Sequence, residues 1–139
     1  MLPSHPPYDE LVDFRKKTHK NVYVLASHSH FFMDNVYNTV CRRDHSEEVL
    51  PGWIVGTAGA PRYRLPADLT GSTQHMADVS GYLLAAVSPD GTIAFEFKQV
   101  NEADVTESTR KDYTDQFIHS CFDKNSSTYQ PEGPACARR

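Results

Sequence analysis

Apolar positions in the first half of the chain predict one amphipathic helix and two short strands. Over residues 8–17 they recur at helical spacing, after two prolines and before a group of lysines. The run 21–27 is apolar without polar alternation, which is typical of a strand buried on both faces. After a highly charged segment, 41–50, a second short strand over 51–56 leads into a glycine-rich turn.

The second half of the chain predicts a hairpin followed by a helix. Residues 62–78 show no period and indicate a long surface loop. Strands over 81–87 and 92–100 flank Ser88-Pro-Asp-Gly91, a strong hairpin signal. One face of the second strand is expected to be buried, and it carries Ile93, Phe95 and Phe97. A helical apolar stripe over 117–122 and a polar tail follow, so we expect an α/β fold with a mixed sheet.

Size and charge narrow the class of protein. With 139 residues the chain is long enough for one domain. Lys and Arg total 14 against 18 Asp and Glu, without a run of either sign, which disfavours nucleic acid as a partner. No apolar stretch approaches the roughly 20 residues of a membrane span, and the first residues lack a signal peptide. We therefore expect a soluble chain, cytoplasmic as written, or periplasmic or secreted if an upstream signal peptide is missing.

The three cysteines leave two alternatives open. Cys41, Cys121 and Cys136 lack the close paired spacing of a four-thiolate zinc site. A disulfide between Cys121 and Cys136 would close a loop of about 15 residues and indicate an oxidising compartment. Unpaired thiols are the equally acceptable alternative.

The clearest candidate chemistry is Ser27-His28-Ser29-His30, directly after the first predicted strand. Side chains at i and i+2 of an extended segment project to the same side, so His28 and His30 could reach one shared pair of metal ions. A strand end holds such ligands on a rigid scaffold. Two hydrogen-bonded histidines at a strand end are the alternative.

Residues 22–30, Val-Tyr-Val-Leu-Ala-Ser-His-Ser-His, resemble the strand and Gly-His-x-His motif of calcineurin-like metallophosphoesterases, the superfamily of the purple acid phosphatases. Ser27 stands where that family has glycine. The resemblance continues through the strand and glycine-rich turn at 50–60 and the hairpin at 81–100. It implies a partial four-layer α/β sandwich, with residues 1–105 as the C-terminal part of the domain and 106–139 as a C-terminal helix and polar tail.

The resemblance also implies a reaction. The family site holds two divalent ions, Fe, Mn or Zn, and hydrolyses phosphate esters, with His28 as ligand of one ion and His30 of the other. His5, followed by two prolines, resembles the isolated metal-binding histidine of the family, although a solvated N-terminal histidine is the alternative. The remaining histidines are expected at the surface, at His19, His45, His75 and His119.

The family's Asp-x-His, Gly-Asp and Gly-Asn-His motifs have no counterpart in the 27 residues before His28. We therefore expect a fragment that is inactive alone and associates with a missing N-terminal half or with itself. A non-catalytic interaction module that uses an exposed sheet edge is the alternative function. A truncated reading frame is a third interpretation.

Overall fold

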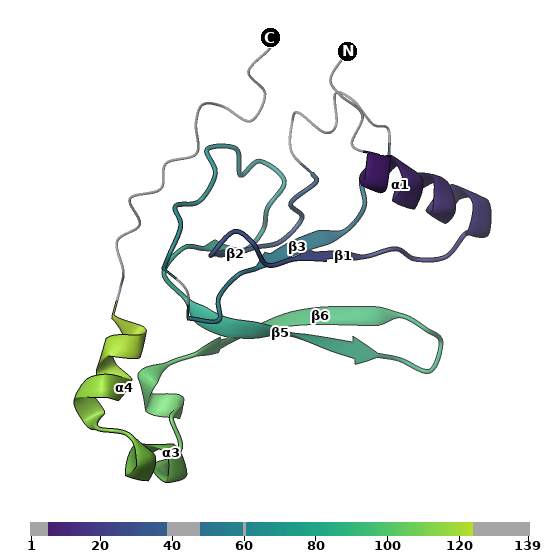
Figure 1. Ribbon diagram of the computed structural model, residues 1–139. Coiled ribbons are helices and arrows are strands. Elements are labelled where there is room, and N and C mark those ends of the chain that lie inside the picture. Colours follow the sequence, from purple (N-terminus) through teal and green to yellow (C-terminus); the bar gives the residue numbers. More distant parts are fainter. Residues whose placement is uncertain (1–5, 39–47, 60, 124–139) are drawn as a thin grey trace.

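The structure is a computed structural model that describes residues 6–38, 48–59 and 61–123 (Figure 1). Helix α1 (Pro6–Thr18) lies against one face of a four-stranded sheet, and the hairpin β5–β6 lies under the other face. Three short helical segments follow the hairpin at its open end. Mixed helix and strand content, a mixed sheet and a hairpin near the C-terminal side confirm the general α/β class.

Charged residues at both ends stabilise helix α1, and one apolar stripe packs it on the rest of the chain. Asp9 lies in its first turn and three basic residues lie in its last, which complements the helix dipole. His19 follows in the left-handed conformation (φ 57°), and its N–H donates to the carbonyl of Arg15 (2.8 Å). Tyr8 and Val12 are buried against Leu50, whose N–H donates to the Tyr8 hydroxyl (3.0 Å). The helix is therefore fastened to the chain just before β3.

The sheet has the strand order β1-β3-β2-β4. Its strands are short: β1 (Val24–Ala26), β2 (Phe32–Met33), β3 (Gly52–Val55) and β4 (His75–Met76). β1 runs parallel to β3, whereas β2 pairs antiparallel with both β3 and β4. Phe32 and Met33 are almost completely buried, so the short central strand β2 forms the middle of the core.

The expectation of an interior strand over 21–27 is wrong for the residues that the structure describes. β1 is shorter than predicted and lies at the edge of its sheet, with β3 as its neighbour. The Leu25 side chain is 58 % exposed. An apolar run shows that a strand tolerates burial on both faces, but it does not determine whether a second neighbour is present.

The hairpin is confirmed, with β5 (Ser80–Val87) paired to β6 (Ile93–Val100). Aromatic side chains of β6 join it to the sheet. Phe95 contacts Trp53 and Tyr23, with ring centroids 4.3 and 5.1 Å apart. Phe97 stacks on Phe32 at 4.0 Å. The prediction that one face of the second strand points inward is therefore confirmed.

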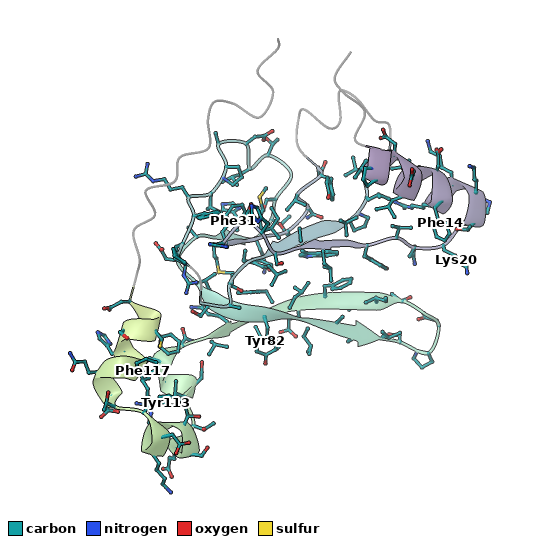
Figure 2. All side chains as sticks on the ribbon, viewed as in Figure 1. Phe14, Lys20, Phe31, Tyr82, Tyr113 and Phe117 are labelled. Atoms are coloured by element: carbon teal, nitrogen blue, oxygen red, sulfur yellow. The ribbon has the colours of Figure 1, made fainter. Side chains whose placement is uncertain are left out.

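The C-terminal segment consists of η1 (Glu102–Asp104), α3 (Glu107–Asp112) and α4 (Asp115–Phe122). Thr106 and Thr114 cap the two α-helices by accepting hydrogen bonds from backbone N–H groups. Within the predicted stripe Ile118 is buried, whereas Phe117 stacks on Tyr113 at the surface (Figure 2). Among the described residues no helix has the length and apolar character needed to cross a membrane.

The predicted surface loop over 62–78 contains β4 and is anchored by a buried carboxylate. Asp34, directly after β2, accepts hydrogen bonds from the Ser72 hydroxyl (2.8 Å) and from the backbone N–H groups of Thr73 (2.7 Å) and Gln74 (2.9 Å). Burial alone would raise the pKa of Asp34, but the hydrogen bonds from Gln74, Thr73 and Ser72 outweigh it and hold the pKa below its ordinary value. The ionised carboxylate therefore stabilises the folded loop.

We expect Asp34→Asn to lower the free energy of unfolding by about 1–3 kcal/mol at pH 7, because the amide is a weaker acceptor than the carboxylate. The folded pKa lies below the unfolded value of about 3.9, so this contribution is complete above that pH and is lost as the pH falls toward the folded pKa. Urea denaturation at pH 7, 5 and 3 measures it, with the exposed Asp13→Asn as the matched control. A constant difference between Asp34→Asn and wild type across this range would contradict the assignment.

Candidate functional site

The candidate site is the turn 27–31 between β1 and β2. β1 and β3 are parallel, so their carboxyl ends lie at the same edge of the sheet, where this turn meets the segment 56–63 that follows β3. The extended backbone predicted through His30 is not observed. The chain bends from residue 28 onward, and the Phe31 N–H donates to the Ser29 carbonyl (2.9 Å), closing a γ-turn around His30. Strand periodicity therefore cannot define the directions of the two imidazoles.

Gly56 allows the turn to lie directly on the backbone that leaves β3. A Cβ atom at this position would lie 2.0 Å from the carbonyl oxygen of Ser29 and 2.8 Å from that of Ser27. The Gly56 N–H donates to the Phe31 carbonyl (3.1 Å). Any side chain at position 56 would therefore push the histidine turn away from the sheet edge.

His30 is held by three contacts with the segment after the glycine-rich turn. Its Nδ1 lies 2.7 Å from the carbonyl oxygen of Pro61. Its own carbonyl accepts from the Tyr63 N–H (3.2 Å), and its ring stacks on that of Tyr63 with centroids 4.2 Å apart and planes at 26°. The ring is half-buried and its orientation is defined by both backbone and side-chain contacts.

The contact with Pro61 also determines which nitrogen carries the proton. A carbonyl oxygen accepts hydrogen bonds and does not donate, so Nδ1 of His30 must be the donor. In the neutral ring Nε2 is then the atom with the lone pair. Histidine ligands of metal ions commonly donate their second ring N–H to a backbone carbonyl in this manner, which fixes the tautomer and raises ligand basicity. His30 is thus suited to bind a cation, or to accept a proton, through Nε2.

The other predicted ligands are less well defined. His28 lies in the same turn with an exposed side chain, and His5 lies outside the described residues. His19 and His75 are exposed, as predicted, and Nδ1 of His75 lies 3.2 Å from the Ser72 hydroxyl. Across the described ranges no group of three or more His, Cys, Asp or Glu side chains is placed to hold a metal ion. The turn therefore offers one oriented imidazole, at His30, and one exposed neighbour, at His28.

Several other predictions fall on residues that the structure does not describe. These are Cys41, His45 and Cys136. Cys121, for which a disulfide with Cys136 and an unpaired thiol were the alternatives, is exposed, and its thiol donates to the Phe117 carbonyl (3.4 Å). Cys136 lies outside the described residues, so both alternatives stand as they were.

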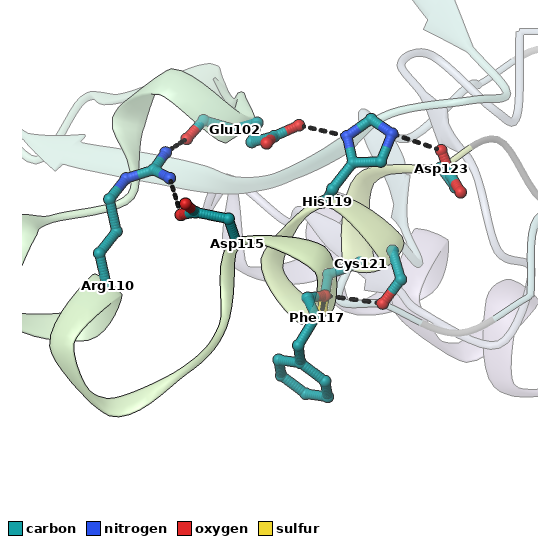
Figure 3. A network of polar contacts seen from close by, with 8 residues as sticks. Glu102, Arg110, Asp115, Phe117, His119, Cys121 and Asp123 are labelled. Atoms are coloured by element: carbon teal, nitrogen blue, oxygen red, sulfur yellow. Dashed lines mark hydrogen bonds and ion pairs between the residues drawn. The ribbon is translucent and has the colours of Figure 1, made fainter.

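His119 is exposed, as predicted, but belongs to a polar network (Figure 3). Its Nδ1 lies 2.9 Å from Glu102 of η1, and its Nε2 lies 3.4 Å from Asp123. The hydrogen bond and charge of Glu102, assisted by Asp123, raise the pKa of His119. Arg110 donates to the Glu102 carbonyl (2.7 Å) and pairs with Asp115 (3.3 Å). The network fastens α4 to η1 and engages both ring nitrogens of His119, so this residue is not a candidate ligand.

A cavity of about 140 Å³ lies between the base of the hairpin and α4. Polar side chains form most of its wall, including Arg62, Ser80, Asn101 and Asp123, and neither His28 nor His30 lines it. Small-molecule sites are mostly apolar with a few polar groups, so this cavity does not have the composition of a typical ligand pocket.

In comparisons with known proteins, no family model, no curated protein and no solved structure matches this chain. The geometry of the histidine turn is therefore the basis for a functional proposal.

We expect Gly56→Ala to lower the free energy of unfolding by about 1–3 kcal/mol or more, because the methyl group would overlap the carbonyl oxygens of the turn. The exposed Ala58→Ser, two residues away, is the matched control and should leave stability unchanged within about 0.5 kcal/mol. Chemical denaturation of the three proteins provides the comparison. Equal stability of Gly56→Ala and wild type would mean that the turn does not pack on Gly56.

Proposed function

We propose that this chain contributes His28 and His30 to the dinuclear metal site of a calcineurin-like metallophosphoesterase, and that the completed site hydrolyses phosphate esters. The observation that carries the proposal is the hydrogen bond from Nδ1 of His30 to the Pro61 carbonyl (2.7 Å). It selects the tautomer in which Nε2 is available to a metal ion. The family resemblance draws on β1, the histidine turn, β3 and the hairpin, which follow one another in this order with β2 and β4 between them.

The chain's own contribution is to hold the ligands in place. Stacking on Tyr63 restricts rotation of the His30 ring, and Gly56 lets the turn lie against the sheet edge. When bound, two divalent ions, Fe, Mn or Zn by resemblance, supply an activated water and stabilise charge on the phosphoryl oxygens. A rigidly supported imidazole loses less side-chain entropy on binding a metal ion than a mobile imidazole does.

The exposed edge of β1 supports the idea of a half-domain. Its sequence is apolar on both faces, but Leu25 is 58 % exposed and β3 is its neighbour on one side. A further strand parallel to β1, supplied by an N-terminal half, would end beside His28 and could bring carboxylate ligands there. Helix α1, the four-stranded sheet and the hairpin would be three layers of the four-layer α/β sandwich.

Cobalt(II) is a spectroscopic probe of the two ligands. We expect the purified chain to bind Co²⁺ weakly, with a change in visible absorption on imidazole coordination, and His30→Ala to abolish it. Tyr63→Leu should keep the signal but weaken binding by about tenfold, because the ring loses its support. His19→Ala changes an exposed histidine directly after α1, is the control, and should bind as wild type does. Binding that survives His30→Ala would eliminate the proposed ligand.

The chain alone should not hydrolyse a generic aryl phosphate substantially when Mn²⁺, Fe²⁺ or Zn²⁺ is added. The reason is that the described residues bring no third ligand to the two histidines. A phosphate-release assay with each ion measures this, and no added ion is the blank. Efficient turnover that His30→Ala removes would disprove the fragment interpretation, although it would support the metal site.

A non-catalytic interaction module is the second candidate, and the exposed β1 edge favours it, because unpaired strand edges accept a strand from another chain. In that case the histidines would be structural. A stably folded monomer whose spectrum does not change with Co²⁺ would favour this function over the first.

A further inference from the structure

The outer face of the hairpin, which points away from the four-stranded sheet, carries an unusual apolar column. Inward-facing Phe95 and Phe97 lie opposite Ala85 and Leu83 across the β5–β6 ladder, so the even-numbered residues face outward. Tyr82 and Leu84 are 54 % and 46 % exposed, and Ala86 is also exposed. Figure 2 shows Tyr82 on this outer side.

A column containing two opposite charges runs beside the apolar one. Lys98 lies opposite Tyr82, and Glu96 lies opposite Leu84. Lys98 and Glu96 form an ion pair with each other along β6. The outer face therefore has two successive rungs, each with one large apolar and one charged residue, and the two charges have opposite signs.

This pattern is complementary to itself. The pair Leu83–Phe97 lies between these two rungs. A two-fold axis that passes over this pair, perpendicular to the strands and parallel to the sheet, would stack two hairpins face to face with their strands antiparallel. Tyr82 of one copy would meet Leu84 of the other, and Lys98 would meet Glu96. The two-fold operation makes each of these contacts twice, which gives two apolar contacts and two charge pairs.

We propose that the outer face of β5–β6 is a self-association surface, and that its occupant is a second copy of this chain. Charge complementarity selects this occupant. A helix that covers a sheet packs on an apolar sheet face. Here two of the four residues in the two central rungs are charged. The proposal is independent of metal binding, since His28 and His30 lie in the turn of the other sheet.

The hairpin tips would extend the contact. At about 3.3 Å per residue, the tip 88–91 of one copy would pass the end of the partner's β5 and approach its α3–α4 segment. Tyr113 and Phe117 are about half exposed there. A face of two strands remains small beside the roughly 800 Å² per partner of a stable interface, so a weak, concentration-dependent dimer is expected.

Charge reversal provides the test. Sedimentation velocity from roughly 10 µM to 1 mM should show wild type passing from monomer to dimer. Lys98→Glu or Glu96→Lys alone would place like charges together and weaken association by about tenfold. The double variant, E96K with K98E, restores opposite charges across the axis and should return the dissociation constant to within about threefold of wild type. Leu84→Thr, which suits a strand, should weaken the dimer without altering the charges.

Leu25→Ser is the matched control, because it changes another exposed leucine, on the β1 edge, and should leave the dimer intact. Circular dichroism of each variant confirms folding. A wild-type chain that stays monomeric at 1 mM would overturn the proposal and leave this face to a different molecule or to a helical layer. Dimerisation lost in Leu25→Ser, or not restored in the double charge reversal, would also overturn it.

Discussion

The close approach of two backbone segments at Gly56 is the constraint on which the candidate site depends. Carbonyl oxygens of the histidine turn occupy the space that a Cβ atom would need, and the Gly56 N–H binds the carbonyl of Phe31. The next residue, Thr57, is buried and donates its hydroxyl proton to the Gly81 carbonyl (2.7 Å). Two consecutive residues therefore join the turn, the four-stranded sheet and the start of the hairpin.

The short strand β2 organises the rest of the core. Phe32 faces the hairpin, where it stacks on Phe97, and Met33 is buried beside it. Asp34 then accepts hydrogen bonds from residues 72–74, which lie 38 to 40 positions away in sequence. Three consecutive residues thus link the sheet, the hairpin and the long loop. This explains how a sheet of such short strands keeps a defined arrangement.

Local patterns in the sequence predicted the elements well where their cause is local. The hairpin follows from Ser88-Pro-Asp-Gly91, where Gly91 has a φ of 83°, and α1 follows from helical spacing and end charges. The edge position of β1, the buried role of Asp34 and the γ-turn at His30 were not predicted. Each depends on residues far away in the chain, and apolar periodicity contains no information on which strand lies next to which. The site residues therefore stay a prediction, and the backbone around them bends where an extended conformation was expected.

The partner that orients His30 is the main-chain oxygen of residue 61, and this has a consequence for mutagenesis. An alanine scan would replace the proline ring and leave that oxygen in place, so position 61 would score as tolerant. The scan would assign the whole effect to His30 and Tyr63. Shortening or lengthening the segment between Gly56 and Tyr63 by one residue would instead displace the acceptor, and would reveal a dependence that side-chain substitution conceals.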